Sequence, residues 1–346
     1  MSERLLSYGE AIDEAIRQEM ARDPSVFMMG EDIVGAAGRP EFWENLGGAY
    51  GGNRGLIVDF GPERVIDMPV SEMAFSGAGV GAAMAGARPI VDIMFIDLIG
   101  CCYDQLINQA PKIRYMTGGG YDCPVVFKTS YGGRAIPGLP KGGGAGVHHS
   151  QTMYSVVAHF PGLKVLTPST PYNAKGLMTA AIRDNDPVMF LTHRFLGSVR
   201  GHVPEEPYTV PIGKADIARE GEDLTMVSIG GALPLCFEAA DTLAADGLEA
   251  EIVDLQTINP IDEQTVYESV EKTHRLLVVD EDTPVASIGR DVAARVAQNR
   301  FGYLDAPVTS LHSADVPVPY SAALEEHMPP TAEKIVAAVN EMLVAF

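Results

Sequence analysis

The sequence lacks several features that would restrict its class at once. No run of eighteen apolar residues occurs, so we expect no membrane-spanning helix. The N-terminus, MSERLLSYGEAIDEAI, has the pattern of an amphipathic helix and not of a secretory signal peptide. The four cysteines show no CxxC spacing, which favours reduced thiols and a cytoplasmic location. A net charge of −21 opposes binding to nucleic acid or to an anionic membrane.

Several short catalytic motifs are also missing. No predicted strand is followed by GxGxxG, which argues against a nicotinamide site, and neither GxxxxGK[ST] nor GxSxG occurs. His148 and His149 are adjacent, without helical i, i+4 spacing and without a nearby cysteine, so they do not indicate zinc. The composition, 46% hydrophobic and 21% charged, is typical of a soluble globular protein.

The chain instead alternates short apolar strands with helices. Expected strands and helices up to residue 191 alternate as follows: strands 26–29, 65–67, 89–95, 124–127, 163–166 and 188–191; helices 71–86, 97–116, one starting near 150, and 172–183. A proline-containing stretch over about 197–222 resembles a linker, and alternation then resumes to a helix at 331–343. This pattern predicts two doubly wound α/β domains with parallel sheets, residues 1–200 and 201–346.

The stretch Asp67–Pro89, DMPVSEMAFSGAGVGAAMAGARP, joins a strand end to a helix that is rich in glycine. A glycine inside a helix costs about 1 kcal/mol relative to alanine. We therefore expect these glycines to permit close approach of another backbone or of a flat ligand. Glu72 would lie in the first helical turn, where a carboxylate can simply cap the helix or can face a ligand.

Polar and aromatic residues are expected at one edge of the first sheet. In open parallel sheets, ligands bind outside the carboxyl ends of the strands. Glu31 and Phe95 end their predicted strands, Glu72 follows its own, and His148-His149 close a glycine-rich loop before a predicted helix. Each residue separately has an ordinary structural explanation, but their shared edge favours a site.

A second candidate site lies in the sequence AAIRDNDP, where Asp184 and Asp186 follow a predicted helix. The last carbonyls of a helix have no intrahelical partner. This segment is either an ordinary polar turn or a place where a hard monovalent cation is held by backbone oxygens and a carboxylate.

Long runs of the chain, taken together, resemble one known family. These runs are YGEAIDEAI, GEDI, FGPERVIDMPVSEMAFSGAGVGAAMAGARPIVDIMF, DQLINQAPKIRYMTGG, HHSQTM, PGLKVLTPSTPYNAKGLMTAAIRDNDPV and ADVPVPYS. They are similar to the beta subunit of the thiamine-diphosphate-dependent decarboxylating component of 2-oxo acid dehydrogenase complexes, a family with pyruvate, branched-chain and acetoin enzymes. The resemblance covers nearly the whole chain in order. It implies a transketolase-like pyrimidine-binding domain followed by a transketolase C-terminal-like domain.

The resemblance also implies an assembly and a cofactor. Family members form heterotetramers of two alpha and two beta chains, with thiamine diphosphate between them. The beta chain binds the aminopyrimidine, whereas the alpha chain binds the diphosphate and magnesium through a GDG…N motif, which this sequence lacks. The implied partners are therefore an alpha subunit, a lipoyl acyltransferase core and a small 2-oxo acid or acetoin.

The site residues follow from the resemblance, position by position. Glu72 matches the glutamate that shares a proton with the aminopyrimidine nitrogen, which makes the cofactor a better base toward its own thiazolium carbon. His149 matches a histidine that assists reductive acylation of the lipoyl group. The other matching positions lie around the cofactor: Glu31, Val70, Ser71, Met94, Phe95 and Leu98. A potassium site of some members matches Val125, Ala181, Ile182, Asp184 and Asp186, although others have asparagine where this chain has Asp186.

Two loops depart from the commoner members. The first, Gly35–Gly55, holds extra residues around Trp43, and the second, Gly132–Gly146, carries Arg134 and Lys141. Both departures concern substrate choice and not the chemistry.

Three functions are compatible with these features. The first is oxidative decarboxylation of a 2-oxo acid with acyl transfer to lipoamide. The second is cleavage of acetoin with the same cofactor. The third is a non-catalytic scaffold that docks the acyltransferase core through Met342–Phe346, a segment that equally suits the end of a packed helix.

Overall fold

The computed structural model describes residues 4–35, 39–44, 47–48, 52–133 and 145–345. These residues form two compact units, which are described separately. The first contains the described parts of Met1–Tyr131, Val156–Thr192 and Leu196–Ile212. The second contains those of Gly132–Ser155, His193–Phe195 and Gly213–Phe346. The described parts of 132–155, together with 193–195, thus pack with the second unit, whereas the sequence suggested one division near residue 200.

Helices and strands alternate through the first two hundred residues. In chain order they are β1 (Leu5–Ser7), α1 (Tyr8–Arg22), β2 (Val26–Glu31), η1 (Pro40–Phe42), α2 (Leu56–Phe60), β3 (Val65–Met68), α3 (Glu72–Met84), β4 (Arg88–Phe95), η2 (Ile96–Cys102), η3 (Asp104–Gln109), α4 (Ala110–Met116), β5 (Val126–Tyr131), α5 (Tyr154–Ala158), β6 (Lys164–Leu166), α6 (Pro171–Arg183), β7 (Val188–His193), η4 (Arg194–Ser198) and β8 (Arg200–His202).

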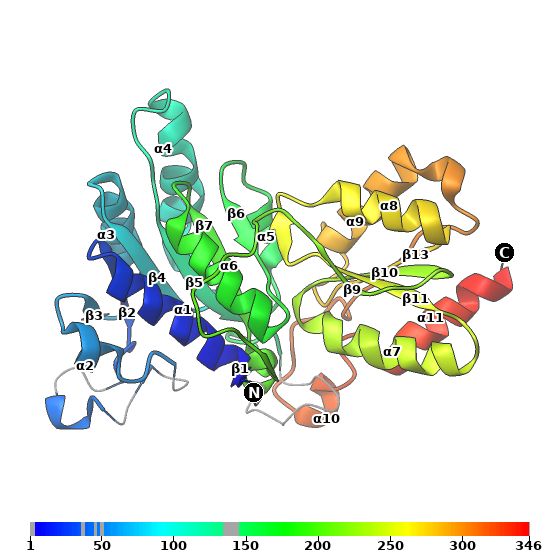
Figure 1. Cartoon of the computed structure of the whole chain (residues 1–346), viewed down its shortest axis with the longest axis horizontal. Helices are drawn as coiled ribbons and strands as arrows, with labels where there is room; N and C mark the ends of the chain where they lie inside the picture. The colour runs from blue at the N-terminus through cyan, green and yellow to red at the C-terminus, as the bar shows by residue number, and fades with distance from the viewer. Residues whose placement is uncertain (1–3, 36–38, 45–46, 49–51, 134–144, 346) are drawn as a thin grey trace. The chain divides into compact units, whose positions relative to one another are not determined.

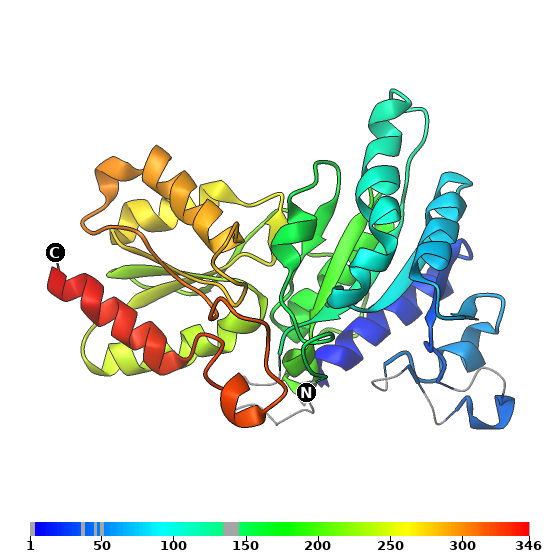
Figure 2. The same ribbon diagram turned by 180° about the vertical axis from the view of Figure 1, so that it is seen from behind.

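The main sheet of the first unit has the strand order β6-β7-β5-β4-β2-β3. Strand β2 pairs with β3 and β4 in parallel, and β4 pairs with β5 in parallel. Helices α1 and α6 lie side by side on one face (Figure 1), and α3 and α4 cover the opposite face (Figure 2). Because both faces are covered, strands such as β4 are largely apolar and buried. The fold confirms the predicted α/β class.

The start of α1 shows how the sequence specifies a helix terminus. The Ser7 side chain accepts a hydrogen bond from the Glu10 amide, and the Glu10 carboxylate accepts one from the Ser7 amide at 2.7 Å. This reciprocal capping box satisfies two amides that the helix leaves unpaired. The amphipathic pattern at the N-terminus thus begins as a helix at Tyr8, directly after its Ser7 cap.

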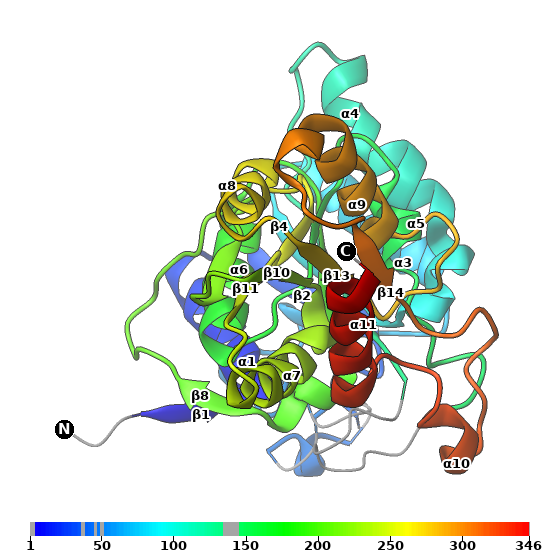
Figure 3. The same ribbon diagram turned by 90° about the vertical axis from the view of Figure 1, so that its right-hand side faces the viewer.

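The second unit contains a five-stranded sheet in the order β14-β13-β10-β11-β9. Helices α8 and α9 cover one face, and α7 and α11 cover the other (Figure 3). Its elements are β9 (Asp216–Arg219), β10 (Leu224–Ser228), η5 (Gly230–Ala232), α7 (Leu233–Ala245), β11 (Ala250–Asp254), β12 (Thr257–Asn259), α8 (Glu263–Thr273), β13 (Leu276–Val279), α9 (Ile288–Asn299), η6 (Phe301–Tyr303), β14 (Thr309–Leu311), α10 (Ala322–Glu325) and α11 (Ala332–Ala345).

Several predicted boundaries were wrong. The helix expected over 97–116 is a 3-10 segment, a π-helical turn and a short α-helix in succession, and the helix expected near Ser150 begins at Tyr154. The expected linker 197–222 contains two strands, of which β9 pairs antiparallel with β11 at the sheet edge. Parts of the Gly35–Gly55 loop, Arg134, Lys141 and Phe346 lie outside the described residues.

Two expectations from composition concern cysteine and membranes. All four cysteines are free, and Cys101 is exposed whereas the other three are buried. Across the ranges given above, no helix is long and apolar enough to cross a membrane.

Candidate active site

The carboxyl ends of β2, β3 and β4 lie at one edge of the first unit's sheet, because these three strands are adjacent and parallel. Glu31 is the last residue of β2 and Phe95 is the last residue of β4. The chain leaves β3 at Met68, which is in register with Glu31, and enters α3 at Glu72. The topology therefore brings Glu31, Glu72 and Phe95 to the same edge, as the strand-end rule requires.

The Glu31 carboxylate lies in a partly desolvated, negatively charged environment. Burial raises the pKa of Glu31 above its ordinary value, and the negative charges of Glu72, Asp32 and Asp67 raise it further. A carboxyl group in such surroundings keeps its proton more readily than an exposed carboxyl group, and strongly perturbed carboxyl groups of this kind are common at functional sites. The interaction with Glu72 also shows that the two glutamates are electrostatic neighbours.

Apolar side chains adjoin the two glutamates. Val70 is 73% exposed and Met73 is 59% exposed, although both are large apolar residues on either side of Glu72. Phe95 is buried, whereas Ser71, Met94 and Leu98 are half-buried. Within this chain, then, carboxylates and uncovered apolar groups occur together, and this combination suits a heterocycle with polar edges and an apolar face.

The glycines of α3 serve different purposes. A Cβ at Gly79 would lie 2.4 Å from the Val91 side chain, so this glycine lets α3 pack closely on β4. Gly86 has φ +97° and follows the helix end, where glycine is favoured. A Cβ at Gly81 would meet no described atom within 4 Å. Close approach is therefore shown at Gly79, but against a strand side chain and not against a backbone or a ligand.

His149 belongs to the second unit. Its amide donates to the Gly146 carbonyl at 3.2 Å, and its own carbonyl accepts a hydrogen bond from the Arg194 guanidinium at 2.6 Å. The neighbouring Ser150 hydroxyl accepts from the Ala145 amide. These bonds fix the backbone of the turn and leave the His149 imidazole half-exposed. His148 is exposed.

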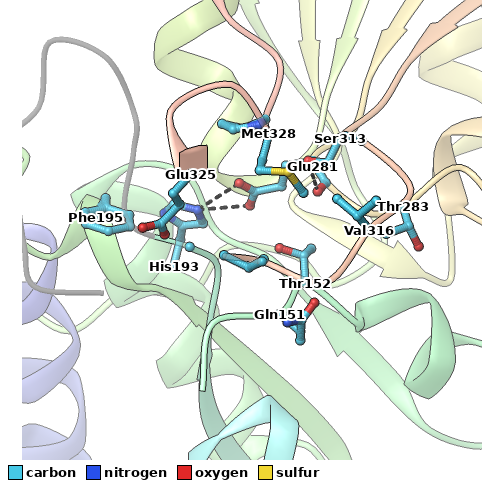
Figure 4. A pocket seen from close by; sticks show the side chains of 14 residues that line it. Gln151, Thr152, His193, Phe195, Glu281, Thr283, Ser313, Val316, Glu325 and Met328 are labelled. Atoms are coloured by element: carbon cyan, nitrogen blue, oxygen red, sulfur yellow. Dashed lines mark hydrogen bonds and ion pairs between the residues drawn. The ribbon is translucent and has the colours of Figure 1, made fainter. Parts of the chain in front are cut away.

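The second unit also contains a small cavity of about 40 Å³, which is not at any residue predicted from the sequence (Figure 4). His193 Nε2 lies 2.9 and 3.0 Å from the two Glu281 carboxylate oxygens at its wall, and the buried carboxylate Glu325 also lines it. A cavity of this size holds roughly two or three water molecules and not a sugar or a heterocycle. Glu281 follows the end of β13. Applying the strand-end rule to the second sheet could therefore have identified Glu281 as a candidate site residue.

The structure brings together the five residues predicted to bind potassium, but their oxygens already form hydrogen bonds or ion pairs with other groups of the protein. Lys164 Nζ lies 2.7 Å from Asp184 and 3.1 Å from Asp186, and the Arg114 guanidinium lies 2.8 Å from Asp186. Burial would raise the pKa of Asp186, but the bonds to Lys164 and Arg114 outweigh it and lower that pKa. The backbone carbonyl oxygens of the set also accept hydrogen bonds. Those of Ile182 and Asp184 accept from the Arg88 guanidinium. The carbonyl of Ala181 accepts from the Asp184 amide, and the carbonyl of Val125 accepts from the Val188 amide.

A potassium ion does not fit these residues as they are arranged. It would have to displace the Lys164 ammonium from both carboxylates and the Arg88 guanidinium from the carbonyls. Among the described residues, moreover, no group of three or more His, Cys, Asp or Glu side chains is placed to hold a metal ion.

Comparison with known proteins agrees with this geometry. The family model described as "Transketolase, pyrimidine binding domain" matches residues 5–198, and "Transketolase, C-terminal domain" matches residues 213–335. A solved structure described as a split-gene transketolase, an inactive beta4 tetramer, has a TM-score of 0.75 at 20% identity and covers 98% of both chains, which shows a shared fold. The protein is thus of the transketolase type.

Proteins with similar sequences define the family within the transketolase type. The acetoin:2,6-dichlorophenolindophenol oxidoreductase subunit beta of Cupriavidus necator is 48% identical over 98% of both chains. The 2-oxoisovalerate dehydrogenase subunit beta of Bacillus subtilis is 41% identical over 98% of both. The pyruvate dehydrogenase E1 component subunit beta of Rhizobium meliloti is 43% identical over 96% of this chain and 68% of its own length. The chain belongs to the family of beta subunits of 2-oxo acid and acetoin dehydrogenases.

Proposed function

We propose that this chain is the beta subunit of a thiamine-diphosphate-dependent oxidoreductase that cleaves the carbon–carbon bond next to a carbonyl group. The leading reaction is oxidative decarboxylation of a 2-oxo acid with acyl transfer to lipoamide. The observation that carries this proposal is the placement of Glu72 in the first turn of α3, beside the Glu31 carboxylate at the sheet edge. Bound thiamine diphosphate would supply a carbanion that adds to the substrate carbonyl and stores an electron pair.

The residues of this chain have defined tasks in that proposal. Glu72 would bind the aminopyrimidine nitrogen and hold a proton on it, in the same role that the family resemblance assigns. Glu31 would bind the same ring through its own carboxyl group. Val70, Met73 and Phe95 would cover the apolar faces and exclude water, which strengthens the hydrogen bond to Glu72. Ser71, Met94 and Leu98 would complete the wall.

The remaining parts of the machinery lie in partners. We propose that an alpha subunit binds the diphosphate and magnesium in an α2β2 heterotetramer, and that a lipoyl acyltransferase core accepts the acyl group. His149 would approach the lipoyl group through its half-exposed imidazole. We keep the two domains proposed from the sequence, a pyrimidine-binding domain at 1–200 and a C-terminal α/β domain at 201–346. A cytoplasmic location is part of the same proposal.

A substitution at Glu72 tests the catalytic role. The Glu72→Ala chain, assembled with its alpha subunit, should reduce an artificial electron acceptor at least a hundredfold more slowly than the wild-type complex, because the proton on the cofactor ring is no longer held. The matched control is Glu63→Ala, an exposed glutamate on the loop before β3, which should keep wild-type turnover. Undiminished turnover of Glu72→Ala in an assembled complex would refute the assignment and favour the scaffold function.

Acetoin cleavage is the second candidate, and a specific observation favours it. Two relatives, from Cupriavidus necator and Bacillus subtilis, are subunits of acetoin oxidoreductases and are 48% and 43% identical to this chain. The assembled complex should therefore be compared directly with pyruvate, branched-chain 2-oxo acids and acetoin in one acceptor assay. Release of carbon dioxide distinguishes the 2-oxo acid reaction, whereas acetaldehyde is the product expected from acetoin.

A further inference from the structure

Asp67 bonds to the turn that follows Glu31. It lies in β3, directly opposite Gly30 of β2. Its Oδ1 accepts a hydrogen bond from the Val34 amide at 3.2 Å, and the nearby Ile33 amide helps to oppose the rise in the Asp67 pKa. The bond from Val34 ties the turn after β2 to the neighbouring strand β3.

The turn itself is sharply defined. Asp32 has φ +51°, in the left-handed region that side chains other than glycine rarely adopt. Ile33 and Val34 beyond it are each only 2% exposed, so the chain must turn inward directly after the strand. A backbone in this conformation persists where surrounding bonds hold it, and the bond from the Val34 amide to the Asp67 carboxylate is one of them.

The opposite side of β2 is also constrained. A Cβ at Gly30 would lie 2.5 Å from the Asp92 carbonyl oxygen of β4, so the backbone there is pressed against its other neighbour. Glu31 is therefore held between a close strand contact at Gly30 and a bonded turn at Asp32–Val34. Its side-chain direction depends on both.

We propose that Asp67 is a positioning residue for Glu31: by accepting the hydrogen bond from the Val34 amide, it sets the direction in which the Glu31 carboxylate leaves the sheet edge. This inference rests on the proposed function, because Glu31 is assigned there to the cofactor ring. No functional role for Asp67 follows from the sequence alone.

The charge of Asp67 has a second consequence. Three other carboxylates are within electrostatic range of Glu31: Asp32 after the end of β2, Asp67 on β3, and Glu72 on α3. Burial raises the pKa of Asp67, while the bond from the Val34 amide opposes the rise. Because the negative charge of Asp67 contributes to the raised pKa of Glu31, neutralising it lowers the pKa of Glu31.

Two variants separate the bond from the charge. Asp67→Asn keeps an acceptor oxygen for the Val34 amide and removes the charge, whereas Asp67→Ala removes both. In the assembled complex, Asp67→Ala should bind thiamine diphosphate at least about tenfold more weakly, because a carboxylate displaced by about 1 Å loses its productive geometry. Asp67→Asn should keep the neutral-pH affinity within about threefold and shift the limb of the cofactor-binding pH profile that Glu31 controls to lower pH.

A measurement on the isolated chain requires neither cofactor nor alpha subunit. The sole tryptophan, Trp43, lies in the same loop as the turn, and Gly48 of this loop lies against the Asp32 and Ile33 carbonyls. The Trp43 emission maximum should shift in Asp67→Ala and stay at the wild-type position in Asp67→Asn and in the control Glu63→Gln.

The outcomes are decisive in both directions. The proposal is supported if Asp67→Asn keeps cofactor binding, Asp67→Ala loses it, and the pH limb shifts in Asp67→Asn. Equal loss in both variants, or wild-type binding and emission in Asp67→Ala, overturns it. If Asp67→Ala does not fold, Asp67→Asn decides alone: weakened cofactor binding together with a shifted emission maximum in that variant overturns the proposal, because its acceptor oxygen for the Val34 amide is kept. Failure of the proposed function gives a different result. The wild-type complex would then show no cofactor binding, while the Trp43 emission of the isolated chain would still report on the turn.

Discussion

Asp282 is a buried carboxylate that accepts hydrogen bonds from the Ser155 hydroxyl and the Thr283 amide, and it makes stability depend on pH. Burial raises the pKa of Asp282 to about 7, the neighbouring charge of Asp280 adds to this, and hydrogen bonds from Ser155 and the Thr283 amide oppose it. The folded protein therefore holds this proton to higher pH than the unfolded chain, whose pKa is near 3.8. Folding stability is accordingly lost as pH rises from about 4 to about 7.

Asp282→Asn should remove this pH dependence. The amide can keep both hydrogen bonds, accepting from Thr283 and donating to the Ser155 hydroxyl. The variant should be more stable than wild type above pH 7, and the difference should shrink by about 1 kcal/mol per pH unit on acidification. Urea unfolding at several pH values measures it, with Asp246→Asn, an exposed carboxylate after α7, as the control. A constant difference across pH 4–7 would contradict the assignment.

At the residue scale, the sequence predicts those site residues that the topology determines. Glu31 and Phe95 could be placed at the sheet edge because each ends a short apolar strand between turn residues. The Asp67 bond to Val34 could not be predicted, because it depends on a left-handed residue whose sequence, Glu-Asp-Ile-Val, contains no glycine or asparagine signal. The His193–Glu281 pair joins residues far apart in the sequence, which no local pattern reports.

At the scale of one element, α3 offers two glycines with opposite expectations. Gly79→Ala places a Cβ 2.4 Å from Val91 and should destabilise the isolated chain by about 1–3 kcal/mol through overpacking. Gly81→Ala meets no described atom and should stabilise it by roughly 0.5–1 kcal/mol, since alanine is the better helix former. Urea unfolding of the two variants provides the comparison. Equal effects would show that helix propensity, and not packing on β4, decides both positions.

The turn after α6 predicts how this protein responds to potassium. Because the Lys164 ammonium already lies between Asp184 and Asp186, the wild-type midpoint of thermal unfolding should be the same in potassium chloride and in choline chloride at equal ionic strength. Lys164→Met leaves both carboxylates without that cation and should gain stability from potassium selectively. Lys112→Met, an exposed lysine on α4, should show no such gain. Selective stabilisation of the wild type by potassium would show that the ion displaces Lys164.

Element boundaries were less predictable than element types, for physical reasons. The strands β1, β8 and β12 have three residues each, too few for a period-two pattern to be distinguished from a loop. The stretch 96–116 has continuous helical character in the sequence, yet its backbone passes through 3-10 and π geometry before α4, because tertiary packing overrides local propensity. The amphipathic pattern at the N-terminus and the helix expected over 172–183 correspond to α1 and α6.

At the scale of the whole molecule, the acidic composition should govern the response to salt. The net charge of −21 makes the folded chain repel itself, whereas exposed ion pairs such as Arg295–Asp291 contribute only about 0–1 kcal/mol each. The Debye length falls from about 30 Å at 0.01 M to about 8 Å at 0.15 M, so added salt screens the repulsion across the surface before it weakens close pairs. The buried Lys175–Glu14 pair is screened least, since the Lys175 side chain is 0% exposed.

Thermal unfolding of the isolated chain should therefore shift upward by a few degrees between 0.01 and 0.15 M sodium chloride. Choline chloride should give the same shift, because screening depends on ionic strength and not on the identity of the cation. An equal concentration of a neutral solute is the control and should give none of the ionic-strength dependence. A downward shift would mean that surface ion pairs, and not net repulsion, dominate the electrostatic free energy, and a shift specific to one cation would indicate a bound ion instead of screening.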